Sequence, residues 1–199
     1  MADKKKDKDR VQEGQVTYEA YAGMPDDGRR YEIFDGVLEM MSPGPSTIHQ
    51  LVHARLFNAM QKCSSDYVIL YAPLDVILSR TNVVQPDLIM VHRSRLDIVT
   101  VRGIEGAPDL VVEVLSPGSR SRDKVRKMNI YAKHQIPEYW IVDVQSRTLE
   151  RHVLAGDRYE LRDLFEGEDT VTSEKLPCVS FAVSELFNDA SLQKLLTLN

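Results

Sequence analysis

Short apolar runs bounded by turn residues alternate along the chain with stretches whose apolar residues recur at helical spacing. This mixture of periods predicts an α/β fold. From Tyr31 the residues YEIFDGVLEMM contain two apolar runs on either side of Asp35-Gly36. Asp-Gly between two such runs is a strong signal for a tight turn, so the first element is predicted to be an N-terminal β-hairpin.

A helix is predicted from Ile48 to Cys63, because Thr47 and Gln50 form a capping box and apolar residues follow at helical spacing. Three β-like runs come next, separated by polar or glycine-containing connections. The buried apolar face predicted for this helix consists of Val52, Leu56, Ala59, Met60 and Cys63. The three β-like runs are Tyr67–Leu78, Val83–Val91 and Asp109–Leu115.

The third run is followed by a second helix, which Ser119 or Ser121 can cap and which Pro137 ends. Its predicted apolar face consists of Val125, Met128 and Ala132. Together with a buried strand at Tyr139–Val142, this gives a strand–helix–strand unit that is normally parallel and right-handed. A meander (Thr148–Leu154 and Tyr159–Leu161) and an amphipathic stretch (Ser184–Leu196) complete the chain.

The composition is that of a globular protein: of 199 residues, 43% are hydrophobic and 28% are charged. This length predicts a single domain over residues 16–199. It follows a polar, charge-rich leader at residues 1–15 that lacks periodicity and is predicted to be disordered. No apolar stretch is long enough for a membrane span and no secretion signal is recognisable.

Two cysteines, Cys63 and Cys178, lie far apart, and neither belongs to a CxxC motif. This spacing predicts neither a disulfide framework nor a thiolate zinc site, and it favours a reducing cytoplasm.

Charge is distributed unevenly along the chain. The net charge is −5, yet the segment from residue 120 to 133 has six basic residues and one acid. Such a helix either presents a solvated basic face or contacts phosphates. Residues 150–199 have ten acids and five bases, which argues against nucleic-acid contacts there. The candidate phosphate contacts are Arg120, Arg122, Lys124, Arg126 and Lys133.

Several nucleotide and hydrolase motifs are absent from the sequence: GxxxxGK[ST], GxGxxG, GxSxG and the EF-hand loop. His49 and His53 have the spacing of HExxH, but Gln50 stands where the general-base glutamate would be. This argues against a zinc site on that helix.

Glu113 is the residue that points most clearly to chemistry. It lies within Leu110–Leu115, where every other residue is apolar, so the strand is predicted to be covered on both faces. A carboxylate buried there needs a partner or a metal. The alternatives are that Glu113 points outward or pairs with an arginine.

Asp87 precedes a second apolar strand, where Pro-Asp is also ordinary turn chemistry. If the two acids lie side by side in one sheet, they form a hard oxygen site suited to Mg²⁺ or Mn²⁺. On the second helix, Asp123, Lys127 and Tyr131 follow one another at i, i+4 and i+8. This spacing could place the Lys127 ammonium at the rim of that sheet. Alternatively, the residues form an ordinary Asp–Lys pair beside a partly buried tyrosine.

A set of motifs, in this order, resembles the Uma-two family of restriction-endonuclease-like proteins. The motifs are Tyr31-Glu32-x-x-Asp35-Gly36, His49, Pro86-Asp87, Pro108-Asp109 through Glu113 to Ser116-Pro117, Asp123-x-x-x-Lys127-x-x-x-Tyr131 and Pro137-Glu138-Tyr139-Trp140-Ile141-Val142-Asp143. That family belongs to the Pro-Asp…(Asp/Glu)-x-Lys nuclease superfamily, which implies a mixed β-sheet flanked by helices.

The resemblance also implies a catalytic site. Asp87 and Glu113, with the Val114 carbonyl, would bind Mg²⁺ or Mn²⁺. Leu115 stands where the superfamily has its lysine, so Lys127 would take over that role from the next helix, with Lys124 as a weaker candidate. Glu32 matches an additional acid of the family, and His49 and Tyr131 would line the site.

The function implied is a metal-dependent endonuclease that hydrolyses DNA phosphodiester bonds. Leu115, the net negative charge and the lack of a separate DNA-reading domain favour an alternative, a non-catalytic nuclease-like module that binds DNA or protein. RNA or another phosphodiester would use the same site. A homodimer would suit cleavage of both strands, and the sequence leaves this open.

Overall fold

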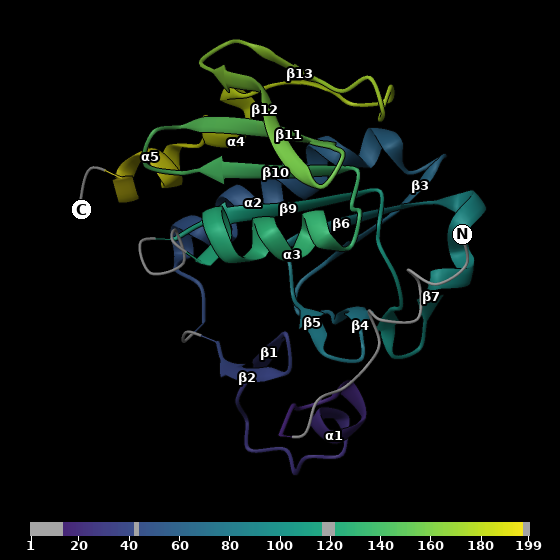
Figure 1. Cartoon of the computed structure of the whole chain (residues 1–199). Helices are drawn as coiled ribbons and strands as arrows, with labels where there is room; N and C mark the ends of the chain where they lie inside the picture. Colours follow the sequence, from purple (N-terminus) through teal and green to yellow (C-terminus); the bar gives the residue numbers. More distant parts are fainter. Residues whose placement is uncertain (1–13, 42–43, 117–121, 197–199) are drawn as a thin grey trace.

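The computed structural model describes residues 14–41, 44–116 and 122–196, with the backbone alone for residues 122, 123 and 196. Most of the predicted leader therefore lies outside the described residues. Within them, the Gln15 side chain donates a hydrogen bond to the carbonyl of Asp35 (2.9 Å). Two mixed sheets and their helices form an α/β fold, which confirms the predicted fold class (Figure 1).

The sheet with the longer strands, here called the central sheet, has the strand order β12-β11-β10-β9-β6-β3. Its neighbour, the hairpin sheet, has the order β2-β1-β5-β4-β8-β7. The strands of the central sheet are β3 (Tyr67–Tyr71), β6 (Leu88–His92), β9 (Leu110–Leu115), β10 (Glu138–Asp143), β11 (Thr148–Ala155) and β12 (Arg158–Glu166). Those of the hairpin sheet are β1 (Tyr31–Phe34), β2 (Val37–Met40), β4 (Val76–Ser79), β5 (Asn82–Val84), β7 (Val99–Thr100) and β8 (Gly103–Ile104).

Two of the predicted local units are confirmed. Strands β1 and β2 form the antiparallel hairpin, and its turn residues Asp35 and Gly36 both have positive φ (48° and 83°), as a type I′ turn requires. Strands β9 and β10 are parallel, with Glu113 opposite Ile141. The chain between them forms the predicted helical crossover, so the strand–helix–strand unit is present.

Helices cover both faces of the central sheet (Figure 1). Helix α2 (Thr47–Met60) packs on one face, and α3 (Met128–Lys133) packs on the other. Side chains of a strand point alternately to opposite faces. Val112 and Val114 therefore belong to the core beneath α2, and Glu113 points toward α3.

The other helical and short strand segments are α1 (Tyr18–Ala22), the 3₁₀ turns Gln61–Cys63 and Arg93–Ile98, a π-helical segment Arg122–Lys127, β13 (Thr170–Thr172), β14 (Ser180–Ala182), α4 (Ser184–Phe187) and α5 (Ala190–Leu196).

Two predicted boundaries need correction. The cap of α2 is Ser46, whose hydroxyl accepts the N–H of His49 (3.2 Å), and Thr47 is already helical. The predicted runs 67–78 and 83–91 each divide into two strands. The chain leaves the central sheet at Ala72-Pro73 to enter the hairpin sheet, and it returns to the central sheet at Gln85-Pro86. Proline lacks the N–H that a ladder needs, which explains the break.

The predicted apolar face of the second helix is wrong at Val125, which is 59% exposed. Ala132 is buried as predicted and Met128 is partly buried against the core, and the other buried side chains are those of Lys127, Ile130 and Tyr131. Residues 122–127 are π-helical, and a π turn has more residues than an α turn, so a period of 3.6 selects the wrong residue. The suggested caps Ser119 and Ser121 lie outside the described residues.

The expectation of no disulfide is also wrong. Cys63 and Cys178 form a disulfide, with their Cα atoms 5.2 Å apart. The two cysteines are 115 residues apart in the sequence, so no local pattern indicated this pairing. The disulfide links the 3₁₀ turn that follows α2 to the segment before β14. The cytoplasmic location stays a prediction, now without support from unpaired cysteines. Within the described ranges, no helix combines the length and hydropathy needed to cross a membrane.

Candidate active site

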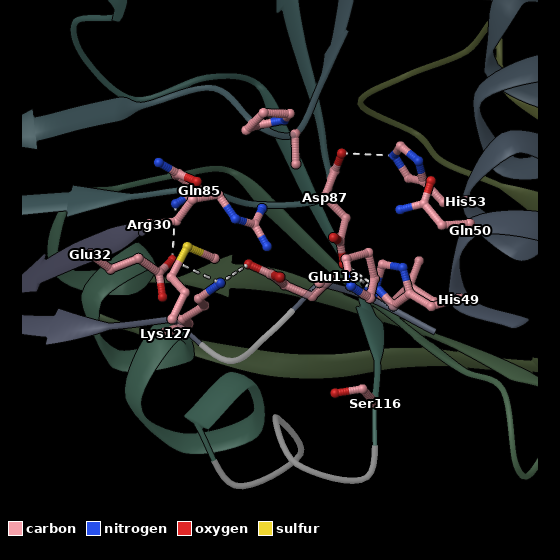
Figure 2. Close-up of a pocket in the computed structure, with 16 residues that line it drawn as sticks. Arg30, Glu32, His49, Gln50, His53, Gln85, Asp87, Glu113, Ser116 and Lys127 are labelled. Carbon is pink, nitrogen blue, oxygen red and sulfur yellow. Dashed lines mark hydrogen bonds and ion pairs between the residues drawn. The ribbon is translucent and has the colours of Figure 1, made fainter. Parts of the chain in front are cut away.

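A pocket of about 470 Å³, lined by charged, polar and apolar residues, lies where the two sheets meet. The hairpin, α2, the approach to β6, the end of β9 and the π-helical segment each contribute side chains to it (Figure 2). The lining residues with polar or charged groups are Arg30, Glu32, His49, Gln50, His53, Gln85, Asp87, Glu113, Ser116 and Lys127. The pocket thus collects the acids and the lysine on which the sequence-based hypothesis depends.

Glu113 is 3% exposed, as expected for a residue on a strand covered on both faces. Its Oε1 accepts hydrogen bonds from Lys127 Nζ (2.8 Å) and from the Tyr131 hydroxyl (2.7 Å). The two donors offset the cost of burying a carboxylate. Burial and the charge of Glu113 raise the pKa of Tyr131 well above its ordinary value, so its hydroxyl keeps the proton that it donates. The outward-pointing alternative is therefore wrong, and among the described residues Glu113 is paired with a lysine and a tyrosine.

Lys127 lies between two buried carboxylates (Figure 2). Its Nζ is 2.8 Å from Glu113 Oε1 and 3.1 Å from Glu32 Oε1. Glu32 is 1% exposed and also accepts the main-chain N–H of Gln85 (2.9 Å). The structure therefore brings together the helix lysine and the additional N-terminal acid, although the hairpin and the helix are distant in sequence.

Asp87 approaches the same pocket from the strand next to β9. Its Oδ2 accepts the N–H of Val114 (2.7 Å) and lies 3.1 Å from His49 Nε2. Burial raises the pKa of this carboxyl, but the hydrogen bond and charge of His49, the Val114 N–H and the charge of Lys127 outweigh burial. The resulting pKa lies below its ordinary value, so Asp87 is an anion at neutral pH.

The structure does not bring Lys124 to this pocket. Its Nζ lies 2.6 Å from Glu150 Oε1 on β11. Two further candidate phosphate contacts are likewise paired: Arg126 with Glu39, and Lys133 with Asp35 (2.5 Å). Arg120 and the side chain of Arg122 lie outside the described residues, as does the side chain of Asp123. The described cations of this basic segment thus hold the hairpin and β11 to the helix.

The pair formed by Lys124 and Glu150 predicts a dependence of stability on pH. Hydrogen bonds from His152 and Lys124 outweigh burial and lower the pKa of Glu150 from near 4.5 to about 2. A carboxyl whose pKa is lower in the folded chain stabilises the fold above its unfolded pKa, and that stabilisation is lost as the pH falls through the folded value. We expect Glu150→Gln to lower the urea midpoint near neutral pH, with a difference from wild type that disappears between about pH 4.5 and 2.

The control is Glu160→Gln on the neighbouring strand, where the carboxylate is exposed. Its difference from wild type should stay small at every pH. A deficit of Glu150→Gln that is the same at low and neutral pH would show that this carboxylate is not stabilised by the pairing.

Sequence reasoning missed Gln85, Arg30 and His53. Gln85 directly precedes the Pro-Asp motif, and its side-chain amide donates to Asp75 Oδ1 (2.8 Å). Its Oε1 is buried and, among the described residues, has no hydrogen-bond partner. His53 Nε2 lies 2.8 Å from the Asp87 carbonyl, one helical turn after His49. The i, i+4 spacing of the two histidines was the available signal in the sequence. The structure shows that both contact Asp87.

Oxygen ligands dominate the donor set, and this chemistry fits Mg²⁺ or Mn²⁺. Over the described ranges, no three His, Cys, Asp or Glu side chains form a group that could hold a metal ion. Mg²⁺ does not need such a group, because it keeps several waters and usually takes one or two carboxylates. The buried, unpartnered Gln85 Oε1 suits a hydrated cation, because the water around a cation donates hydrogen bonds.

Comparisons with known proteins identify the family and the fold. A family model described as "Putative restriction endonuclease", Uma2, matches residues 17–184, which is more than half of the chain. The chain belongs to the Uma2 family. Membership confirms the resemblance seen in the motifs and supports nuclease activity. A comparison with curated proteins found no match.

A solved structure shows the same fold as this Uma2 chain. It is described as a putative nuclease belonging to DUF820 from Anabaena variabilis ATCC 29413. It is 16% identical in sequence with a TM-score of 0.69, and the match covers 86% of this chain and 97% of the other. At this identity the likeness shows a shared fold.

Proposed function

We propose that this protein is an Mg²⁺-dependent nuclease that hydrolyses phosphodiester bonds of DNA. The observation that carries the proposal is the buried Lys127 ammonium, held between Glu113 and Glu32 beside the ionised Asp87. These groups come from the hairpin, two neighbouring strands and a helix, and they line one open pocket. Family membership gives the proposal its reaction class.

Asp87 and Glu113, with the Val114 carbonyl, would hold the cation, and Mn²⁺ would serve in its place. When bound, Mg²⁺ would orient water and offset charge on the phosphoryl oxygens. Asp87 is kept in place by the Val114 N–H and His49, and Glu113 by Tyr131. These contacts hold both carboxylates in defined positions before a ligand arrives, which reduces the cost of reorganisation.

Lys127 would act on the reacting phosphate through its charge. Hydrolysis adds a water oxygen to phosphorus and breaks one P–O ester bond, and negative charge grows on the phosphoryl oxygens. An ammonium fixed by Glu113 and Glu32 can neutralise this charge without first having to be ordered. Glu32 would thus act as a positioning residue, and His49 would position Asp87.

The first test is metal-dependent cleavage by the full chain. We expect the protein to nick a supercoiled plasmid, or to cut a single-stranded DNA circle, with Mg²⁺ or Mn²⁺ and not with EDTA. Calorimetry should show Mn²⁺ binding to wild type that is weakened in Asp87→Asn. Absence of both cleavage and Mn²⁺ binding would overturn the proposal.

A second candidate function is a non-catalytic module that binds DNA or protein. It is favoured by the ion pairs that occupy Lys124, Arg126 and Lys133, and by Leu115 in place of the superfamily lysine. DNA binding that weakens with salt, without hydrolysis in any divalent metal, would select this non-catalytic module.

A homodimer is part of the nuclease proposal, because two copies of the site would cut both strands. Sedimentation with and without DNA tests it.

A further inference from the structure

A row of rings runs from the carboxylate of Asp87 to the surface. His49 contacts Asp87, and its ring is nearly parallel to that of His53, with the centroids 6.4 Å apart. The His53 ring in turn meets the Tyr71 ring edge to face, at 5.9 Å. Exposure grows along the row, from 7% at His49 to 53% at Tyr71. The row therefore ends in an aromatic side chain that is open to solvent.

Tyr71 directly precedes two residues that line the pocket. It ends β3, at one edge of the central sheet, opposite Leu88. The next two residues, Ala72 and Pro73, line the pocket, and the Ala72 N–H donates to the Asp87 carbonyl (3.0 Å). His53 contacts the same carbonyl. Tyr71 is thus adjacent in sequence to Ala72, which lines the pocket and is hydrogen-bonded to Asp87.

Neighbouring rings hold Tyr71 in place although it is exposed. Phe57 packs against it edge to face at 5.0 Å, from one turn beyond His53 on α2. An aromatic side chain that is already ordered loses little conformational entropy when a flat ligand stacks on it. An exposed ring supported by two others has the properties of a stacking platform.

The charge distribution disfavours a binding mode based on duplex phosphates alone. Sequence-independent duplex binding relies on several cations that are available to phosphates. Here the net charge is −5, and the described cations of the basic segment, Lys124, Arg126 and Lys133, are each paired with a carboxylate. Stacking of a base on the aromatic row would add affinity that these paired cations do not supply.

We propose that the substrate is DNA with unpaired bases at the cleavage point, and that one of these bases stacks on Tyr71 while the adjoining phosphate enters the pocket. This inference rests on the proposed nuclease function and names the substrate class of the same site. Within a duplex a base is already stacked between its neighbours, so its face is not available to Tyr71. A single strand offers that face without the cost of unpairing.

The test compares binding of labelled 20-nucleotide single strands with binding of the corresponding blunt duplex, by fluorescence anisotropy. The protein is the full chain with Glu113→Gln, in Mg²⁺, so that cleavage does not interfere. We expect the single strand to bind at least about tenfold more tightly than the duplex, and Tyr71→Ala to weaken single-strand binding by roughly tenfold. Tyr71→Phe should keep the affinity of the parent within about twofold.

The matched control is Leu164→Ala. Leu164 is also 53% exposed, but it lies on β12 at the opposite edge of the central sheet. Its removal should leave DNA affinity unchanged. Equal or tighter binding of the duplex, or full single-strand affinity in Tyr71→Ala, would overturn the inference.

Failure of this inference can be told apart from failure of the proposed function. If the wild-type protein cuts plasmid duplex and Tyr71→Ala cuts it equally well, the nuclease proposal stands and the substrate class is wrong. If single strands bind through Tyr71 but no divalent metal supports cleavage, the stacking contact stands and the hydrolytic function falls.

Discussion

Glu113→Gln is expected to reduce metal-dependent cleavage by at least about 10³-fold while leaving the protein folded. Glutamine keeps the size of the side chain and an oxygen that can accept from Tyr131. It removes one of the two negative charges that would hold the cation. Single-turnover cleavage of plasmid or single-stranded DNA measures the loss, and Asp87→Asn should give a loss of the same order.

Two measurements separate a chemical effect from a structural one. Circular dichroism should show the same secondary structure in wild type and in Glu113→Gln, and calorimetry should show weaker Mn²⁺ binding in the variant. Glu160→Gln, an exposed change of the same kind on β12, should retain wild-type cleavage. If Glu113→Gln and Asp87→Asn both cleave at the wild-type rate, the two acids are not part of the mechanism.

The sequence was informative about Glu113 because burial of a charge has a large energetic cost. An acid in a strand whose other residues are all apolar requires compensation, and helical spacing from Lys127 to Tyr131 offered two donors on one side of a helix. The structure places both donors on the same oxygen of Glu113. The strand–helix–strand unit made this contact predictable, since it brings the crossover helix back over its own strand.

Contacts that join distant segments could not be read from local patterns. Glu32 reaches Lys127 only because the hairpin packs against the helix, and pairs such as Asp35–Lys133 hold it there. Only the family resemblance indicated Glu32. The hairpin sheet was missed as a unit because β7 and β8 have two residues each and β1 meets β5 at the single pair Ile33–Val83. Such short pairings leave no periodic signal.

The helix that carries Lys127 shows a different limit. Its π-helical segment shifts the angular position of the residues that follow, so the apolar face predicted with a regular period included the exposed Val125. π-helical turns are uncommon and occur often at functional sites. Here Lys127 is the last residue of the segment, and its side chain is 4% exposed. The π-helical segment that made the prediction of the apolar face wrong is thus the segment that contains Lys127.

The largest effect on stability is expected for Lys127→Met, which should lower the free energy of unfolding by about 3–5 kcal/mol. Methionine fills a similar volume but leaves Glu113 and Glu32 buried close together without the cation between them. Urea denaturation near neutral pH measures the loss. Lys133→Met makes the same change on the same helix at a half-exposed pair and should cost less than about 1 kcal/mol.

A second substitution shows whether repulsion between the carboxylates causes the deficit. In Lys127→Met with Glu32→Gln, one buried charge is gone while the amide oxygen can still accept the Gln85 N–H. The double variant should therefore be more stable than Lys127→Met alone, a coupling of about 0.5–3 kcal/mol in a double-mutant cycle. Strict additivity would mean that Lys127 stabilises the fold through packing of its stem, because a charge held between two acids must couple to each of them.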